Sequence, residues 1–249
     1  MGSWAAETGP YAEWVELLRL KAVDISAIPI DIGEPMLELS SLLDVLQDSA
    51  IGAQLRPHTL AGLVHHLVAA VQVEDVLTQR LQHAVSVCAL GLASLDRAAE
   101  QMVGASLIGL AAALLRAAHE ELASELLPIE KLASDVDDLL RQRSPSRIAA
   151  WTMNEPLRMI RLQGDRVVAA AQMLEQVRTM VEGASKEKLR ADQLAKLDAA
   201  LPVYTMSSER LIHSTFLSIA RAQAGVSPTA ASGPQNATEE LQAGQVVLF

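Results

Sequence analysis

The segment NEPLRMIRLQGDRVVAAAQMLEQVRTMVEG, residues 154–183, decides the fold class. Asparagine is a preferred helix-capping residue, and the proline two positions later stands in the first turn, where a helix tolerates it. Small and apolar residues then follow one another at spacings of three and four: Ile160, Gly164, Val167, Ala171, Leu174, Val177 and Val181. This spacing is the seam of helical bundles and coiled coils, and its small members permit close approach of a second helix. The segment therefore predicts one long helix packed in a bundle.

The composition of the whole chain favours an all-α protein. Half of the 249 residues are hydrophobic and 3% are aromatic, whereas strands favour aromatic and β-branched side chains. The net charge is −10 and the basic residues are scattered, so nothing marks a nucleic-acid-binding surface. A single cysteine, Cys88, can form neither an intrachain disulfide nor a cysteine-based zinc site, and we expect it in the core.

Two features of the sequence predict a cytoplasmic protein that does not enter a membrane. The N-terminus lacks the basic and apolar segments of a secretory signal. The most apolar stretches, residues 84–95 and 102–115, are each shorter than the roughly 18 residues needed to span a bilayer, and charged residues separate them. We therefore expect buried helices in both stretches.

The chain is expected to divide into three parts. Prolines and a glycine in SAIPIDIGEP, residues 26–35, are typical of a loop, so residues 1–35 are predicted to form an extended arm. A helical bundle domain follows over residues 36–224. Residues 225–249 are rich in Ser, Thr, Ala, Gly and Pro and predict a disordered tail. The tail ends in an apolar cluster that either docks on a partner or folds back on the body: Val246, Val247, Leu248 and Phe249.

The expected bundle is elongated and built on a long antiparallel helical hairpin. A short helix begins at residue 36, and residues 58–127 contain no proline but carry an apolar stripe at helical spacing: Leu60, Val64, Leu67, Val71, Thr78, Val85 and Ala89. Cap-forming residue types at 94–96 favour a break into two helices over one uninterrupted helix. Pro128 predicts the start of another helix, and two further helices are expected over residues 184–201 and 206–223. Such seams and hairpins are also compatible with a homodimer.

Polar side chains enter the apolar stripe at QVEDVLTQRLQHA, residues 72–84. Residues four apart share a helical face and lie roughly 6 Å apart along the axis, so Asp75 and Gln79 are expected to project together. A carboxylate can hold a lysine, and an amide can orient a water because it both donates and accepts hydrogen bonds. Neither group is a strong nucleophile, so a partner would supply the chemistry. Thr78 and Gln82 stand beside the pair and predict a buried polar layer.

EDVLTQRLQH, residues 74–83, resembles the active-site helix of the CheZ family of chemotaxis phosphatases, in which a Gln-Asp pair is followed by Gln four residues after the Asp. The resemblance implies that Asp75 pairs with the active-site lysine of a phosphorylated CheY-type response regulator. It also implies that Gln79 orients the water that attacks the aspartyl phosphate in line. The regulator would hold the magnesium, and this chain would bind no cofactor. Glu74, which stands where the family has Gln, would contact the regulator together with Gln82 and the terminal apolar cluster.

Three alternatives remain open from the sequence. A second pair with the same spacing, Asp138 and Gln142, lies at a predicted helix end and is interpreted as solvated surface. A histidine phosphotransfer domain is also a helical bundle, and His66 or His83 would be its nucleophile, although the Lys and Gly that usually follow the histidine are missing. A non-enzymatic adaptor that binds a signalling partner is the third. The sequence shows no metal-ligand spacing and no nucleotide-binding or serine-hydrolase motif.

Overall fold

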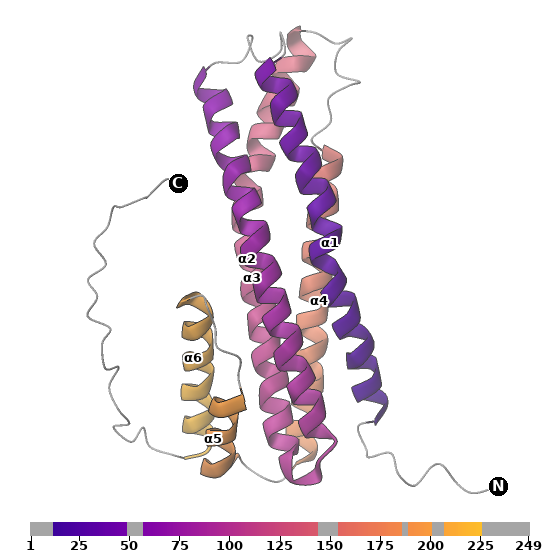
Figure 1. The fold of residues 1–249 in the computed structure, drawn as a ribbon, viewed down its shortest axis with the longest axis vertical. Helices are drawn as coiled ribbons and strands as arrows, with labels where there is room; N and C mark the ends of the chain where they lie inside the picture. Colours follow the sequence, from indigo (N-terminus) through magenta and orange to yellow (C-terminus); the bar gives the residue numbers. More distant parts are fainter. Residues whose placement is uncertain (1–11, 49–56, 144–153, 186–188, 201–206, 226–249) are drawn as a thin grey trace, which may run out of the picture.

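The chain folds into an elongated bundle of α-helices (Figure 1). The structure, a computed structural model, describes residues 12–48, 57–143, 154–185, 189–200 and 207–225. Its elements in chain order are α1 (Ala12–Asp48), α2 (Pro57–Leu95), the 3₁₀ turn η3 (Ala98–Glu100), α3 (Gln101–Arg143), α4 (Asn154–Ala184), α5 (Ala191–Ala200) and α6 (Ser207–Gln223). No strand occurs in these ranges, which confirms the all-α prediction.

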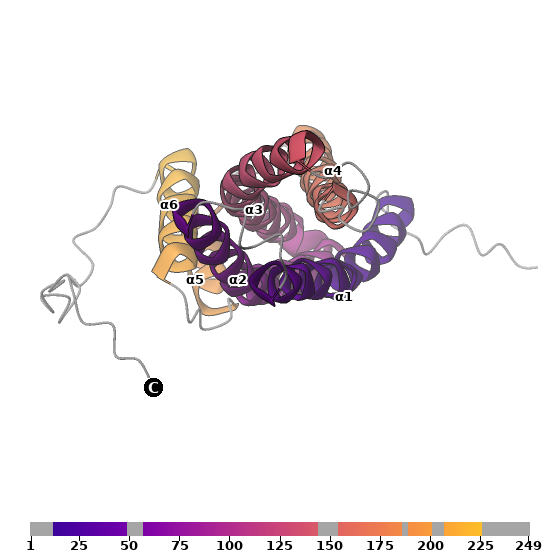
Figure 2. The ribbon, with the colours of Figure 1, turned by 90° about the horizontal axis from the view of Figure 1, so that it is seen from above.

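The four long helices lie side by side along the long axis, and α5 and α6 lie against one side of the bundle near one end (Figures 1 and 2). α2 and α3 pack against each other, α4 packs on α3, and α1 packs on both α2 and α4. The core between these helices contains large, fully buried side chains, among them Leu18, Ile28, Leu81, Leu107, Ile108 and Leu114. The predicted elongated bundle is therefore confirmed.

The predicted antiparallel hairpin is formed by α2 and α3, with the break where the sequence placed it. α2 ends at Leu95, and the Arg97 amide donates a hydrogen bond to the Ser94 carbonyl at 3.1 Å. Near this turn two glycines bring the helices close together: a Cβ on Gly104 would lie 2.7 Å from the carbonyl oxygen of Gly91. Only residues without a side chain fit such a crossing, so the glycines set the separation of the hairpin at this end.

The predicted extended arm is wrong for residues 12–35, which belong to α1. Two prolines lie inside this helix, although a proline in a helix interior costs about 3 kcal/mol. A buried apolar stripe at helical spacing offsets that cost, since each large apolar side chain contributes about 1.5–3 kcal/mol on burial: Val15, Leu18, Ile25, Ile28, Ile32, Met36 and Leu39. The bundle thus begins well before residue 36. Residues 1–11 lie outside the described part of the chain.

Pro128 does not begin a helix, as the sequence analysis expected, but lies inside α3. The reason is the same as in α1, because apolar side chains on both sides of the proline are buried. Leu126, Ile129 and Ala133 lie in the core, where α3 packs against α4. Tertiary packing overrides the local preference of proline here.

α4 matches its prediction closely. The helix spans Asn154–Ala184, with Pro156 in its first turn. All seven residues of the predicted seam, from Ile160 to Val181, are buried. Gly164 lets α3 come close, since a Cβ there would lie 3.4 Å from the Nδ1 atom of His119.

The two short helices lie against the side of the bundle near the α2–α3 turn (Figure 1). α5 is tied to that turn by polar contacts: the side-chain amide of Gln193 donates to the Ala99 carbonyl at 3.0 Å, and Lys196 pairs with Glu100 at 3.2 Å. α6 begins at Ser207, close to the predicted residue 206. The chain beyond residue 225, which was predicted to be disordered, lies outside the described residues.

Candidate functional site

α2 presents a polar stripe to solvent in the middle of the bundle. Asp75, Gln79, Gln82 and Ser86 are all exposed. At 100° per residue these four positions fall within a sector of roughly 60° on the helix. The side chains next to this sector are buried or partly buried, so the stripe is the most accessible part of this stretch of α2.

Asp75 and Gln79 lie on one face, as their spacing predicted, and both are exposed. Leu77 and Leu81 of the same helix are buried in the core. Their burial fixes the rotation of α2 about its axis, so that the carboxylate and the amide both face outward. The pair is not enclosed by a cavity, and it can act only on a molecule that docks over it.

Glu74 faces a different neighbour from Asp75. Its carboxylate lies beside α1, because a Cβ on Gly33 would lie 3.1 Å from the Glu74 Oε1 atom. Partial burial raises the pKa of the Glu74 carboxyl above its ordinary value, and the negative charge of Asp75 raises it further. Glu74 is therefore part of the α1–α2 contact, half-way between the core and the stripe.

The polar layer that the sequence predicted around Thr78 and Gln82 is not buried in the way expected. Gln82 is exposed and Thr78 is partly buried, whereas the charged side chain that enters the core is Arg80. The apolar stripe predicted for α2 is therefore turned too far toward the solvent side of the helix. Ala89, one of its members, is exposed. The buried stripe of this half of α2 is instead Leu77, Leu81, Ala84, Val87, Cys88 and Leu92.

Arg80 joins three helices. Its side chain is 4% exposed, and its guanidinium pairs with Glu121 of α3 at 2.5 Å. The same guanidinium donates a hydrogen bond to the Ser208 hydroxyl of α6 at 3.0 Å. A buried guanidinium is tolerated only when it is paired, so Arg80 fixes where α3 and α6 meet α2.

His83 holds the first turn of α6 through a second buried contact. Its Nδ1 atom lies 2.8 Å and 2.9 Å from the two carboxylate oxygens of Glu209, whose side chain is 0% exposed. His83 is one helical turn from Gln79, on the same side of α2. The clamp formed by Arg80, His83, Ser208 and Glu209, here called the α6 clamp, thus adjoins the Asp75–Gln79 pair.

The sequence analysis missed this clamp, although half of it leaves a signal. Arg80 lies three residues after Leu77 and four before Ala84, so it falls on the buried stripe once that stripe is read correctly. A charged residue on a core stripe predicts a buried ion pair. Glu209 could not be found this way, because its partner lies more than 120 residues away in the chain and no local pattern joins them.

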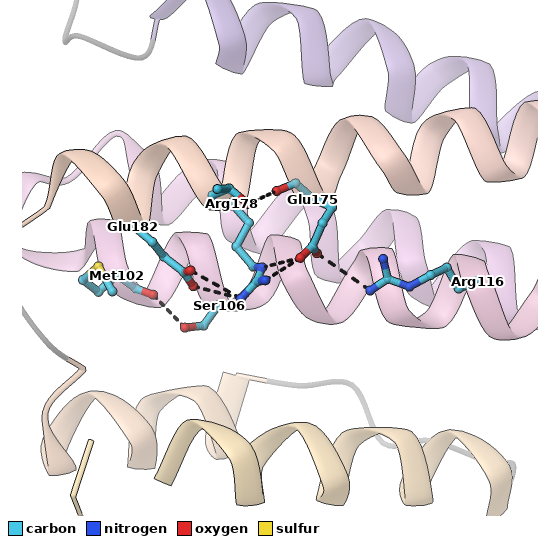
Figure 3. Close-up of polar contacts among 7 residues, drawn as sticks. Met102, Ser106, Arg116, Glu175, Arg178 and Glu182 are labelled. Carbon is cyan, nitrogen blue, oxygen red and sulfur yellow. Dashed lines mark hydrogen bonds and ion pairs between the residues drawn. The ribbon is translucent and has the colours of Figure 1, made fainter. Parts of the chain in front are cut away.

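A cavity of about 610 Å³ separates the flank of α6 from α3 and α4. Leu211, Phe216 and Ile219 of α6 form one wall, and small residues of α3 form part of the other. Figure 3 shows an ionic network on the opposite wall: Arg178 pairs with Glu175 and with Glu182 of its own helix, and Arg116 of α3 reaches Glu175 at 3.7 Å. The charges of this network neutralise one another, so it ties α3 to α4.

The described histidines take part in no cluster of metal-ligating side chains. Within the described residues no group of three or more metal-ligating side chains gathers. The rings of His65 and His66 lie edge to face with centroids 5.5 Å apart, and His83 is held by Glu209. Of the second Asp–Gln pair, Asp138 is exposed, as expected for a solvated surface, and the side chain of Gln142 lies outside the description.

The predicted docking cluster Val246, Val247, Leu248 and Phe249 lies outside the described residues. Among the residues that the structure describes, one stretch, Gln101–Asp135 of α3, is long and apolar enough to cross a membrane. In its most apolar window, 72% of the residues are buried inside the bundle, which gives little indication of a membrane span.

No protein-family model, curated protein or solved structure matches this chain.

Proposed function

We propose that the chain is a CheZ-like auxiliary phosphatase, which stimulates hydrolysis of the aspartyl phosphate on a CheY-type response regulator in chemotaxis signalling. The observation that carries the proposal is the pair on α2: Asp75 and Gln79 are both exposed, one turn apart, on a helix whose opposite face is locked in the core. A group that must enter another protein's active site has to be presented in this way.

Each member of the pair has one role. The Asp75 carboxylate accepts hydrogen bonds from the active-site lysine of the regulator and fixes the orientation of the two proteins. The Gln79 amide orients a water in line with the phosphorus. The water oxygen then bonds to phosphorus as the bond to the aspartyl oxygen breaks, which yields inorganic phosphate and a free carboxylate. Magnesium, held by the regulator, neutralises the phosphoryl oxygens.

The side chains of this chain favour chemistry supplied by a partner. Its one thiol, Cys88, is buried, and burial raises the pKa of that thiol to about 11, so it is not a nucleophile near neutral pH. His83, which a phosphotransfer domain would use, has its Nδ1 atom engaged by Glu209. The protein would then need no cofactor of its own. It would act in the cytoplasm, because response regulators reside there.

The test is phosphate release from a phosphorylated CheY-type regulator in magnesium, with and without this protein. Gln79→Ala removes the amide but no core contact, so we expect stimulated release to fall by about a hundredfold, as when one positioned catalytic group is lost. Gln172→Ala is the control, since Gln172 is an exposed glutamine of α4, away from the stripe. Release that is equally fast with both variants would refute the assignment of Gln79.

A non-enzymatic adaptor is the second candidate, because α6 leaves apolar side chains in solvent next to the cavity. Leu211 is 67% exposed and Ile219 is 54% exposed. Exposed apolar side chains at one place are typical of a protein-binding surface. Binding to the phosphorylated regulator without any faster phosphate release would favour this function.

A further inference from the structure

The stripe on α2 is too small to hold a receiver domain by itself. A standard protein–protein interface buries about 800 Å² on each partner, from some 20–30 residues. Four polar side chains on one helical face supply a small part of that area. A partner centred on Asp75 and Gln79 must therefore also contact the elements that flank the stripe.

The flanks of the stripe are α1 and the first turn of α6. Glu74 faces α1, and Arg80 and His83 face α6. α6 starts beside Arg80 and runs toward the α2–α3 turn, since Phe216, further along it, lies beside Gly109 of α3. Its N-terminal end thus lies beside the middle of α2, where it contacts His83, one turn from Gln79.

The first turn of α6 is fixed in position by an unusual anchor. Glu209 is completely buried, and its carboxylate is held by His83. A buried carboxylate needs a hydrogen-bond partner, so this contact fixes the register of the two helices that it joins. The clamp therefore holds this turn at a defined place beside the stripe.

The same turn carries an exposed cation. Arg210 follows Glu209, is exposed, and makes no ion pair with any residue that the structure describes. The chain as a whole has a net charge of −10, and Arg210 places a positive charge on the turn that contacts His83. Arginine is enriched in protein interfaces and pairs well with carboxylates and phosphoryl oxygens. A phosphorylated receiver domain presents both around its active site.

We propose that the first turn of α6 completes the docking surface for the phosphorylated receiver domain, with Arg210 as a contact residue and the α6 clamp as the anchor that positions it. The inference rests on the proposed function, since the partner is the same. It assigns different roles to the two helices: α2 supplies the groups that act on the phosphate, and α6 supplies affinity for the receiver domain and fixes its orientation.

The first experiment compares two arginines of α6. The affinity for a CheY-type regulator carrying beryllofluoride, a stable phosphoryl mimic, is measured for Arg210→Glu and for the control Arg221→Glu, an exposed arginine three turns away. We expect Arg210→Glu to raise Kd about tenfold at low salt and less at high salt, and Arg221→Glu to change it less than about twofold. Equal Kd values for the two variants would overturn the inference.

The second experiment separates docking from chemistry. Arg210→Glu is expected to raise the regulator concentration needed for half-maximal phosphate release and to leave the rate at saturation unchanged. Gln79→Ala is expected to lower the rate at saturation and to leave the regulator concentration needed for half-maximal release unchanged. If Gln79→Ala leaves the saturated rate intact while Arg210→Glu weakens binding, the phosphatase function fails and the docking surface stands. If Arg210→Glu lowers only the saturated rate, the assignment of α6 to docking is wrong.

The third experiment tests the anchor. Glu209→Ala removes the carboxylate that His83 holds, so amide hydrogen exchange in residues 207–223 should become at least about tenfold faster, while exchange in α4 stays unchanged. Ser214→Ala is the control, since the Ser214 hydroxyl bonds only to the backbone of its own helix. The regulator should bind Glu209→Ala about as weakly as Arg210→Glu. Wild-type affinity in a variant whose α6 exchanges faster would overturn the role of the clamp.

Discussion

α4 and α6 are held to the same bundle by different kinds of contact. α4 buries eleven residues, and nine of them are apolar or proline side chains that form one continuous seam. The described side chains of α6 bury only Glu209, Leu217 and Ala220, and α6 leaves Leu211 and Ile219 largely in solvent. α4 is thus attached by packing, whereas α6 is positioned by the α6 clamp. A helix can thus be precisely placed without being strongly held, and such a helix is suited to a surface that must meet a partner.

The same substitution in α4 and in α6 is expected to give the largest difference in the free energy of unfolding. Leu174→Ala in α4 removes a side chain that is 2% exposed, so we expect a loss of about 2–5 kcal/mol in the free energy of unfolding. Leu217→Ala in α6, where the leucine is 5% exposed, should cost the whole bundle less than about 1 kcal/mol, because α6 can detach alone. Denaturant unfolding followed by circular dichroism measures both. Equal losses would show that α6 unfolds together with the bundle.

Close packing without side chains can be tested at the hairpin. Gly104→Ala would place a Cβ 2.7 Å from the carbonyl oxygen of Gly91, so α2 and α3 must move apart, at a cost of about 1–3 kcal/mol. Gly62→Ala is the matched control, since nothing lies within 4 Å of the added Cβ. This variant should gain about 0.5–1 kcal/mol from better helix propensity. Thermal unfolding of the two variants gives the sign of each change, and a stabilised Gly104→Ala would mean that the crossing is looser than described.

A fall in pH is expected to destabilise the packing of α6 on the bundle and to leave that of α4 unchanged. Burial lowers the pKa of His213 below its ordinary value of 6.5, Asp198 on α5 raises it in part, and Arg221 lowers it. The unfolded chain therefore binds a proton more readily than the folded chain. The free energy of unfolding is highest above pH 6.5, where His213 is neutral in both states, and it decreases as the pH falls toward the lower pKa of His213 in the folded chain. We expect a drop in the protection of α6 amides from hydrogen exchange between pH 7.5 and 5.5, a smaller drop in His213→Leu, and no change in α4. The same drop in both proteins would assign it to other groups.

The smallest effect is expected at the contact between α1 and α2. The pKa of Glu74 is raised by its burial and by Asp75, so the ionised carboxylate destabilises the fold, and the penalty appears as the pH rises above the ordinary value of 4.5. Glu74→Gln removes the charge and keeps the shape, so Tm at pH 7 should rise by about a degree or two. At pH 4 the difference should shrink. A lower Tm at pH 7 would mean that the carboxylate is paired.

Patterns that lie within one helix could be predicted from the sequence, and contacts between distant helices could not. The α4 seam and the shared face of Asp75 and Gln79 follow from spacing alone, and the α2–α3 break follows from cap-forming residue types. Prolines misled the prediction in residues 12–35 and at Pro128, because the buried side chains around them outweigh the local cost. The α6 clamp stayed hidden, since Arg80 and Glu209 reveal a shared site only when the chain is folded.

The α2–α3 hairpin also bears on the order in which the chain folds. Its two helices are adjacent in sequence, with only a short turn between Leu95 and Gln101, so closing this loop costs little entropy. α1 can pack on α2 early, but its contact with α4 joins segments more than 100 residues apart along the chain. On a ribosome, where the chain appears from its N-terminal end, we expect the hairpin to collapse first, α1 and α4 to close the bundle next, and α6 to settle last.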